Sequence, residues 1–225
     1  MKIEPIRTKI FTAMPQTETI LTADGSKTLY SGRFGEHYHS TFGAANESGH
    51  VFIDAGYLAS SANPVSVLEA GFGTGLNAWL TLQQADKLQR HTRYEAIELY
   101  PIDEKTVSEL SDNGIFRRLH SAVWEQPVEI TPCFVLHKRK SDLLQTAFNC
   151  KFDVVYFDAF SPAVQPEMWN SAIFANIYRA MNPGAILTTY CAKGEVRRTL
   201  QNTGFVVERL PGPTGKREML RAKKI

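Results

Sequence analysis

A buried strand that runs directly into a glycine-rich turn is the feature that most constrains this sequence. Residues 67–77 read VLEAGFGTGLN, and helical periodicity follows from Leu76 to Lys87. Glycine allows the backbone to adopt positive φ and to approach a ligand closely. In an open α/β sheet, ligands bind beyond the carboxyl ends of the strands, next to such turns. The motif therefore predicts a doubly wound sheet with a ligand site at this turn.

Strand-like and helix-like segments continue to alternate after the turn, which is typical of a mostly parallel sheet. The last two expected strands are joined by a short Pro/Gly turn and should be antiparallel. We expect a Rossmann-like α/β fold with a doubly wound, seven-stranded sheet. The expected strands are Val65–Glu69, Tyr94–Leu99, Cys133–His137, Phe152–Phe157, Ala185–Tyr190, Phe205–Arg209 and Glu218–Ala222. The expected helices are Leu76–Lys87, a segment from Asp103 to a stop at Gly114, Glu167–Met181 and Glu195–Asn202.

The N-terminal part of the chain has a different pattern. Residues 8–31 alternate polar and apolar side chains around Asp24-Gly25, which predicts a short β-hairpin. Residues 32–50 follow no regular period but combine aromatic, imidazole and glycine residues, which suits the rim of a pocket. We therefore expect residues 1–58 to form a β-rich extension that contributes to the substrate pocket, and residues 59–225 to form the main domain.

Composition excludes several classes of protein. The chain has 225 residues, of which 43% are hydrophobic and 21% charged, so it can bury a core without disulfides or metal. Three widely spaced cysteines and the pair His37 and His39 match no zinc pattern, and we predict no metal site. No apolar run approaches the ~20 residues that span a bilayer. The N-terminus also lacks the apolar stretch of a signal peptide, so we expect a cytoplasmic enzyme.

Positive charge is concentrated near the C-terminal end. Residues 191–225 contain nine Lys/Arg and three Asp/Glu, whereas residues 1–190 contain 16 and 20. A basic end on a nearly neutral protein indicates a phosphate-bearing partner. A solvated, charged surface is the alternative interpretation.

The acid that precedes the glycines indicates the class of cofactor. Glu69 would repel a pyrophosphate, which prefers the free N–H groups of a helix N-terminus, but would pair with the ammonium group of S-adenosyl-L-methionine. Glu98 ends the second strand, where a carboxylate can accept hydrogen bonds from ribose hydroxyls. We predict S-adenosyl-L-methionine as the cofactor; a nicotinamide cofactor is disfavoured because the G-x-G-x-x-G spacing is missing. The expected cofactor-binding residues are Glu69, Gly71, Phe72, Gly73, Thr74, Gly75, Asn77, Glu98, Leu99 and Asp142.

The fourth expected strand leads into Asp158-Ala159-Phe160-Ser161-Pro162. An acid followed by an aromatic residue and a proline resembles the Asp-Pro-Pro-Tyr type loop of exocyclic-amine methyltransferases. Asp158 could hold an amine by hydrogen bonding and take a proton from it, while Phe160 could stack on a planar ring. We predict Asp158 as the catalytic residue. The alternative is a turn residue at Asp158 and a core residue at Phe160.

Several segments together resemble the MnmC-type tRNA methyltransferase domain in a stand-alone form. They are residues 69–77, Asp158–Pro162 with Pro166–Trp169, residues 191–200 (CAKGEVRRTL), Gly204-Phe205 and residues 215–220 (GKREML). The resemblance covers about residues 65–222 and implies a class I S-adenosyl-L-methionine-dependent methyltransferase domain, for which we expect the bounds 59–225. It would convert 5-aminomethyl-(2-thio)uridine at tRNA wobble position 34 to 5-methylaminomethyl-(2-thio)uridine, with Asp158 as the catalytic residue.

The resemblance also implies partners. The tRNA anticodon stem-loop would be the substrate, and a separate FAD-dependent oxidase or another wobble-uridine enzyme would supply the aminomethyl group, because no oxidase domain follows Ile225. Trp169 is a further stacking candidate, although at a helix start it more often belongs to the core. The residues expected to bind the tRNA are Phe160, Pro162, Tyr30, Lys193, Arg197, Arg198, Lys216 and Arg217.

Other functions remain open at this point. The same cofactor site would serve a methyltransferase or aminopropyltransferase that acts on a small amine without nucleic acid. An NAD-dependent oxidoreductase and an RNA-binding module without turnover are two further alternatives.

Overall fold

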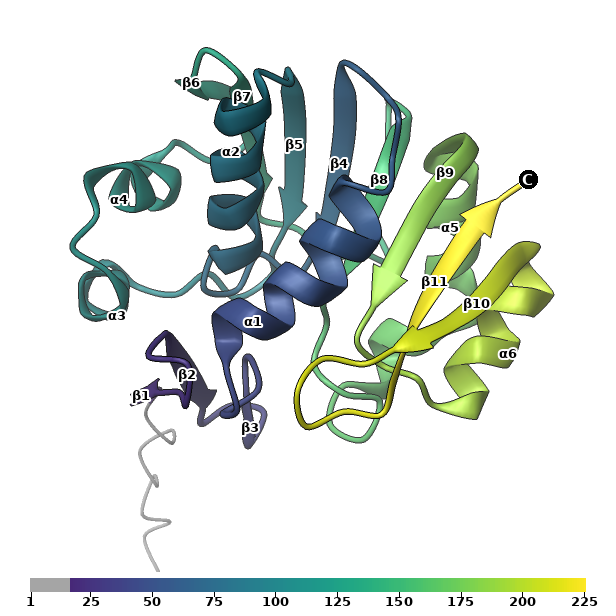
Figure 1. Ribbon diagram of the computed structural model, residues 1–225, viewed down its shortest axis with the longest axis horizontal. Coiled ribbons are helices and arrows are strands. Elements are labelled where there is room, and N and C mark those ends of the chain that lie inside the picture. Colours follow the sequence, from purple (N-terminus) through teal and green to yellow (C-terminus); the bar gives the residue numbers. More distant parts are fainter. Residues whose placement is uncertain (1–16) are drawn as a thin grey trace, which may run out of the picture.

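The computed structural model of the chain describes residues 17–225, so the part of the predicted hairpin on residues 8–16 lies outside the described range. Strands and helices alternate from Val65 onward, as predicted (Figure 1). An eight-stranded sheet forms the centre, and a separate three-stranded sheet lies beyond the carboxyl ends of its parallel strands. The predicted α/β fold is therefore confirmed.

The central sheet has the strand order β10-β11-β9-β8-β4-β5-β7-β6. The five strands from β9 to β7 are parallel, whereas β11 is antiparallel to both β9 and β10, as predicted for the closing pair. The strands are β4 (Val65–Ala70), β5 (Thr92–Ile97), β6 (Pro127–Thr131), β7 (Phe134–Arg139), β8 (Phe152–Phe157), β9 (Met181–Thr189), β10 (Phe205–Pro211) and β11 (Glu218–Lys224).

Strand β6 was not predicted, and it raises the sheet from seven strands to eight. It pairs antiparallel with β7 at the edge, with a register shift between Glu129 and Thr131. Ile130 is the buried residue of this strand, and the others are exposed or partly exposed. An edge strand of this kind lacks the hydrophobic alternation that reveals a strand in a sequence.

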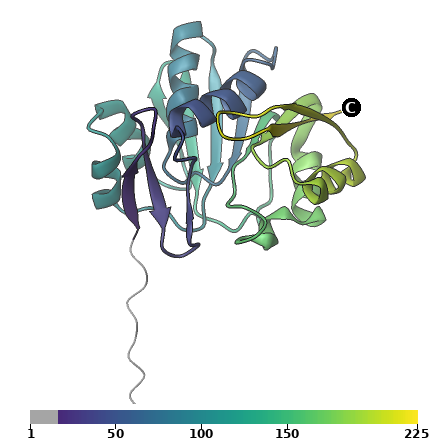
Figure 2. The same ribbon diagram turned by 60° about the horizontal axis from the view of Figure 1, so that its bottom comes forward.

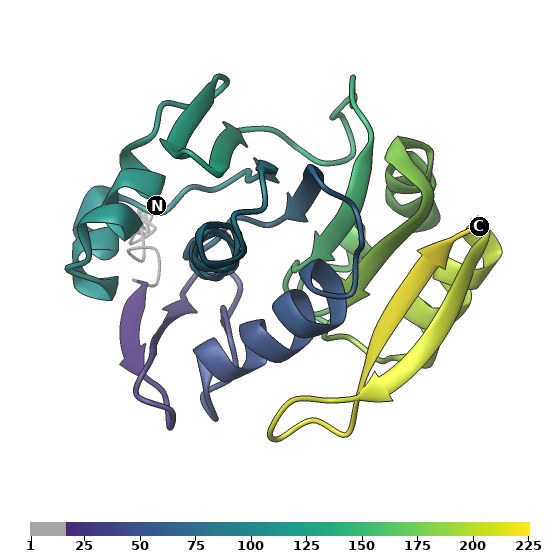
Figure 3. The same cartoon turned by 45° about the horizontal axis from the view of Figure 1, so that its top comes forward.

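Helices cover both faces of the central sheet. On one face lie α2 (Leu76–Leu88) and a continuous helix formed by α1 (Ala44–Ser48) and the π-helical η1 (Gly49–Tyr57). Figure 3 shows these helices next to each other on that face. On the other face lie α5 (Ser171–Ala180) and α6 (Gly194–Thr203). Within residues 17–225, every helix is too short or too polar to cross a membrane.

Two predicted helix boundaries were wrong. Helix α3 (Glu104–Leu110) ends before Gly114, and Gly114 begins α4 (Gly114–Ser121) instead of stopping a helix. The Asn113 side chain caps α4 by accepting hydrogen bonds from two N–H groups of its first turn, which outweighs the low helix propensity of glycine there. The predicted helix 167–181 is also divided, because a 3₁₀ turn, η2 (Pro166–Trp169), precedes the Asn170 cap of α5.

The N-terminal sheet contains the predicted hairpin, with β1 (Glu18–Leu21) and β2 (Lys27–Ser31) paired across the turn at Asp24-Gly25. A short third strand, β3 (Glu36–His37), pairs with β2. Figure 2 shows this sheet in front of the carboxyl-end edge of the central sheet. The remainder of the predicted β-rich extension, residues 44–57, is helical and packs on the central sheet. The domain boundary at residue 58 stays a prediction.

Candidate active site

A cavity of about 320 Å³ lies at the carboxyl ends of β4, β5 and β8. The chain leaves β4 toward β5 and β7 on one side and later adds β8 and β9 on the other, so this is the point where the strand order reverses. Residues from the N-terminal segment and from the β10–β11 loop complete the wall. The predicted site residues that line the cavity are Gly71, Phe72, Gly73, Thr74, Glu98, Leu99, Asp158, Phe160 and Lys216.

The glycine turn forms one wall of the cavity with bare backbone. Gly71 has a φ of +95°, and a Cβ atom there would lie 2.7 Å from the carbonyl oxygen of Asp158. Gly73 has a φ of +49°, and its Cβ atom would lie 2.9 Å from the ring of Tyr38. No side chain fits at either position, so the turn leaves its backbone accessible to a ligand.

Glu98 lies on the cavity wall where β5 ends. Its Oε2 accepts a hydrogen bond from the Gly73 N–H at 3.0 Å, and its Oε1 accepts one from the Tyr100 N–H at 2.8 Å. Each carboxylate oxygen has a second lone pair, so both can still accept a hydroxyl of a bound molecule. The Glu98 carboxylate is thus held in a fixed position that suits the two hydroxyls of a ribose.

Glu69 lies beneath the cavity wall, and its side chain is fully buried. The Asn77 side-chain amide donates to Glu69 Oε1 at 2.9 Å and to Asp158 Oδ2 at 2.7 Å, which links the two carboxyl groups. Glu69 Oε2 accepts no hydrogen bond from residues 17–225. Burial raises the pKa of Glu69 well above its usual range. A buried carboxyl group without a full set of donors would be stabilised by a cationic group, and this property fits the ammonium-bearing end of S-adenosyl-L-methionine.

Asp158 is partly buried and lines the cavity immediately after β8. Burial raises the pKa of its carboxyl group to about 7, against the opposite effect of the hydrogen bond from Asn77. Glu47 raises this pKa further, and the ammonium group of Lys216 lowers it. A carboxyl group that titrates near neutral pH is suited to accept a proton from a substrate.

The segment from Asp158 to Pro162 is held by contacts on both sides. Trp169 Nε1 donates to the Phe160 carbonyl at 2.8 Å, and the Ser161 N–H donates to Glu36 Oε2 at 3.0 Å. Trp169 is buried among core residues, which agrees with the core alternative for this residue. Glu36 belongs to β3, so the N-terminal sheet directly contacts the segment that carries Asp158.

Several cavity residues were missed by the sequence analysis, among them Glu47 and Tyr190, which contact the predicted residue Lys216. Lys216 donates to Glu47 Oε1 at 2.5 Å, and its ammonium group lies 4.0 Å from the centroid of the Tyr190 ring. The Tyr190 hydroxyl donates to the Ala159 carbonyl at 2.9 Å. The irregular pattern of residues 32–50 predicted a pocket rim, but no local signal singled out the buried Glu47 or Tyr190.

The structure does not bring the other predicted substrate residues into the cavity. The Tyr30 ring packs edge-on against His37, with centroids 5.1 Å apart, and Pro162 lies outside the lining. The predicted phosphate contacts Lys193, Arg197, Arg198 and Arg217 also lie outside it. Lys216 differs from these cations because it is paired inside the cavity wall.

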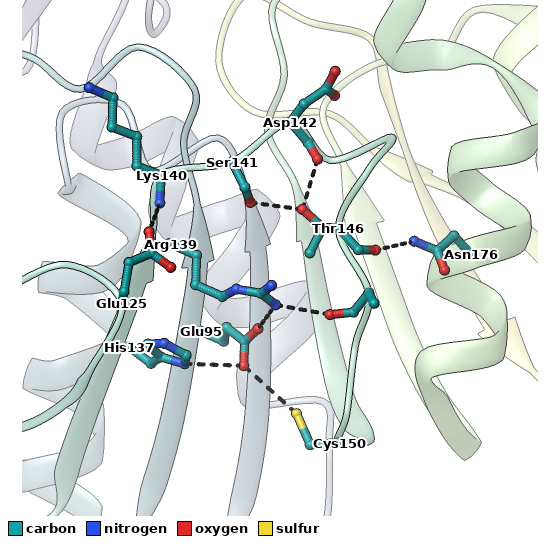
Figure 4. A network of polar contacts seen from close by, with 11 residues as sticks. Glu95, Glu125, His137, Arg139, Lys140, Ser141, Asp142, Thr146, Cys150 and Asn176 are labelled. Carbon is teal, nitrogen blue, oxygen red and sulfur yellow. Dashed lines mark hydrogen bonds and ion pairs between the residues drawn. The ribbon is translucent and has the colours of Figure 1, made fainter.

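Asp142 lies in the loop that follows β7, close to the cavity residues Ser141 and Leu143 but not on the lining itself. Figure 4 shows its carboxylate directed away from Thr146, whose hydroxyl donates to the Asp142 carbonyl at 2.8 Å. Glu95 and Arg139 form an ion pair at 3.0 Å at the base of this loop. This network fixes the loop shape while the Asp142 carboxylate stays at the rim.

A family model described as "S-adenosyl-L-methionine-dependent methyltransferase" matches residues 135–225. Curated relatives of this chain carry the name tRNA 5-methylaminomethyl-2-thiouridine biosynthesis bifunctional protein MnmC. The one from Magnetococcus marinus is 32% identical over 92% of this chain and 34% of its own length. The one from Nitrosospira multiformis is 33% identical over 85% of this chain and 34% of its own length. The chain therefore spans about a third of the length of these relatives.

Similar solved structures include two that cover more than nine-tenths of this chain. MnmC2 from Aquifex aeolicus superposes with a TM-score of 0.79 at 26% identity, over 92% of this chain and 70% of that protein. Spermidine synthase from Thermotoga maritima superposes with a TM-score of 0.65 at 13% identity, over 93% of this chain and 69% of that protein. At the lower identity the likeness concerns the fold alone.

Proposed function

Because this chain is a methyltransferase domain of the MnmC type, we propose that it methylates the aminomethyl group of a modified wobble uridine in tRNA. The observation that carries the proposal is the position of Asp158. Its carboxyl group has a pKa of about 7 and lies in the same cavity as Phe160. The glycine turn and the carboxylates Glu36, Glu47 and Glu98 line this cavity as well. The proposed product is 5-methylaminomethyl-(2-thio)uridine.

The residues of the cavity fit S-adenosyl-L-methionine, which supplies a methyl group activated by a positively charged sulfur. In this proposal the Glu98 carboxylate binds the ribose hydroxyls, and Glu69 with Asn77 stabilises the cationic amino-acid end. The glycine turn allows close approach because Gly71 and Gly73 carry no side chain. Leu99, Phe72 and the rim residue Asp142 are the proposed contacts on the nucleoside side.

Asp158 would prepare the amine for reaction. A primary amine is mostly protonated at neutral pH, and its lone pair is exposed only after a proton leaves. The Asp158 carboxylate can hold the amine by a hydrogen bond and accept this proton, because its own pKa lies near neutrality. The cavity wall also contains Glu36, Glu47 and Glu98, with Lys216 as its one lysine or arginine among residues 17–225, and this excess of carboxylates favours a cationic substrate group.

Apart from Phe160, which lines the cavity, the RNA contacts of the proposal lie outside it. Phe160 would stack on the uracil ring, and Tyr30 and Pro162 would border the loop around it. Lys193, Arg197, Arg198 and Arg217 would contact phosphates and position the anticodon stem-loop. A tRNA substrate places the reaction in the cytoplasm, and we propose that a separate oxidase or another wobble-uridine enzyme provides the aminomethyl group.

Nucleoside mass spectrometry tests this proposal. Purified protein, S-adenosyl-L-methionine and tRNA that bears 5-aminomethyluridine should yield 5-methylaminomethyluridine, whereas tRNA without the aminomethyl group should remain unchanged. Asp158→Ala should abolish the conversion but retain cofactor affinity in calorimetry, because the cofactor contacts assigned above do not include its carboxylate. No conversion by the wild-type protein would contradict the proposal.

A small-amine methyltransferase or aminopropyltransferase is the second candidate, and the acidic cavity wall supports it. Such an enzyme would act on free polyamines and would not bind tRNA in a salt-sensitive manner. Activity on polyamines without activity on tRNA would favour it over the tRNA enzyme.

A further inference from the structure

Four aromatic side chains form a continuous row that begins at the protein surface, and all four line the cavity that contains Asp158. We call this row, consisting of Tyr100, Phe34, Phe160 and Tyr38, the aromatic ladder. Successive ring centroids lie 6.1, 4.4 and 4.9 Å apart, and the Phe34 and Phe160 rings are stacked. Tyr100 is 42% exposed, whereas the other three rings are partly buried. The ladder thus extends from the protein surface along the wall of the cavity that contains Asp158.

The ladder lies between two hollows. The first is the cavity that contains Asp158, and the second is a neighbouring hollow of about 530 Å³. Phe34, Tyr38 and Tyr100 line both hollows. A chain molecule whose reacting end enters the first hollow can therefore extend along the ladder into the second.

The two hollows differ in charge. The first is rich in carboxylates, as described above, whereas the second contains the cations Arg33, Lys105 and Lys140. None of these three forms an ion pair with a carboxylate in the part of the chain that the structure describes. The Arg33 guanidinium lies 4.1 Å from the centroid of the Tyr100 ring, at the outer end of the ladder.

The two acids of the second hollow are engaged in the protein. The Asp103 carboxylate accepts the Thr106 N–H at 2.8 Å and caps helix α3. The Glu109 carboxylate accepts the Thr19 hydroxyl at 2.8 Å. The cations of this hollow are thus more available to a ligand than its acids.

We infer that the second hollow binds the nucleotide adjacent to the methylated one, with its base on Tyr100 and its phosphate near Arg33, Lys105 and Lys140. This inference rests on the proposed function and specifies how the RNA strand leaves the cavity. Stacking on exposed aromatic rings next to cations is the usual way in which proteins hold single-stranded nucleic acid. The substrate is accordingly a segment of single-stranded RNA and not an isolated nucleoside.

The test measures the affinity of the protein for an anticodon stem-loop RNA that bears 5-aminomethyluridine. The free nucleoside serves as the comparison ligand. Tyr100→Ala should weaken RNA binding about tenfold to one hundredfold, because it removes the stacking surface for one base. Tyr100→Phe keeps the ring and should restore the affinity. Arg33→Ala should reduce the slope of log affinity against log salt by about 0.7, the change expected for one lost phosphate contact on a single strand.

The control is Arg93→Ala, because Arg93 is exposed at the amino-terminal end of β5, away from both hollows. This variant should bind and methylate the RNA as the wild type does. Unchanged RNA affinity in Tyr100→Ala would overturn the inference, as would an equal loss of S-adenosyl-L-methionine affinity, which would assign the ring to the cofactor site. Failure of the wild-type protein to methylate any RNA would instead contradict the proposed function.

Discussion

Replacement of Asp158 by asparagine should stabilise the folded protein at pH 8, although this residue is the proposed proton acceptor. The ordinary pKa of the carboxyl group is 3.8, and burial raises it to about 7 in the folded state. The folded protein therefore holds this proton more tightly than the unfolded chain does. The stability that the protonated carboxyl group confers is lost as the pH rises from about 4 to about 7. Above pH 7 the buried carboxylate is ionised, and the free energy of unfolding is reduced by the full amount.

The size of the effect follows from the difference between the two pKa values. One pKa unit corresponds to about 1.4 kcal/mol, so a rise from 3.8 to about 7 corresponds to about 4 kcal/mol. Water in the cavity relieves part of this penalty, and we expect a gain of about 2–4 kcal/mol for Asp158→Asn at pH 8. In a chain of this size the gain corresponds to about 4–16 °C in Tm. An asparagine oxygen still accepts the hydrogen bond from Asn77, so no contact is lost.

Thermal unfolding of both proteins between pH 5 and pH 9 measures this gain. The difference in Tm should grow as the pH rises and should level off above pH 7. The control is Asp153→Asn on the same strand, because the Asp153 carboxylate accepts hydrogen bonds from the Ser66 N–H and the Asn182 amide. An amide would lose one of these acceptors, so this variant should be destabilised. A Tm difference for Asp158→Asn that is independent of pH, or a more stable wild type at pH 8, would refute the reasoning.

Two further predictions concern the walls of the cavity. Gly71→Ala should destabilise the protein by about 2 kcal/mol or more and weaken cofactor binding, because the new Cβ atom meets the Asp158 carbonyl at a φ of +95°. Gly114→Ala is the matched control for the unfolding and calorimetry measurements, since nothing lies within 4 Å of its added Cβ. Equal losses of stability and of cofactor affinity in the two variants would contradict the expectation. Lys216 lowers the pKa of Asp158, so Lys216→Met should shift the acidic limb of the pH profile of kcat/KM to higher pH. Glu47 raises this pKa, so Glu47→Gln should shift the same limb to lower pH. Shifts in the same direction would exclude that electrostatic effect, and Lys216→Arg should preserve the wild-type profile.

The strand ends and the glycine turn could be predicted because their signals are local. Residues 67–77 contain the strand, the turn and the helix start in one stretch, and Asp158 follows directly from a run of buried residues. Parallel strands bring such ends to one edge of the sheet, so the joint position of Glu98 and Asp158 in one cavity followed from topology.

Residues 32–50 were predicted as a pocket rim, but the individual residues that they contribute to the cavity wall could not be predicted in the same way. Glu36 and Tyr38 reach the site through a three-stranded sheet whose docking onto the central sheet depends on tertiary contacts. Lys216 was expected to contact phosphate, because the sequence shows only a cation in a basic region. Its partner Glu47 is 169 positions away, and no pattern in either segment indicates that the two side chains meet.

The contact between Glu47 and Lys216 also has a consequence for the synthesis of the protein. A ribosome releases Glu47 169 positions before Lys216, so the nascent chain already contains the glycine turn and Asp158 when the β10–β11 loop that completes the cavity wall has still to be made. Truncated products that stop before β10 and β11 would retain the glycine turn and Asp158. They would lack the part of the cavity wall that Lys216 contributes.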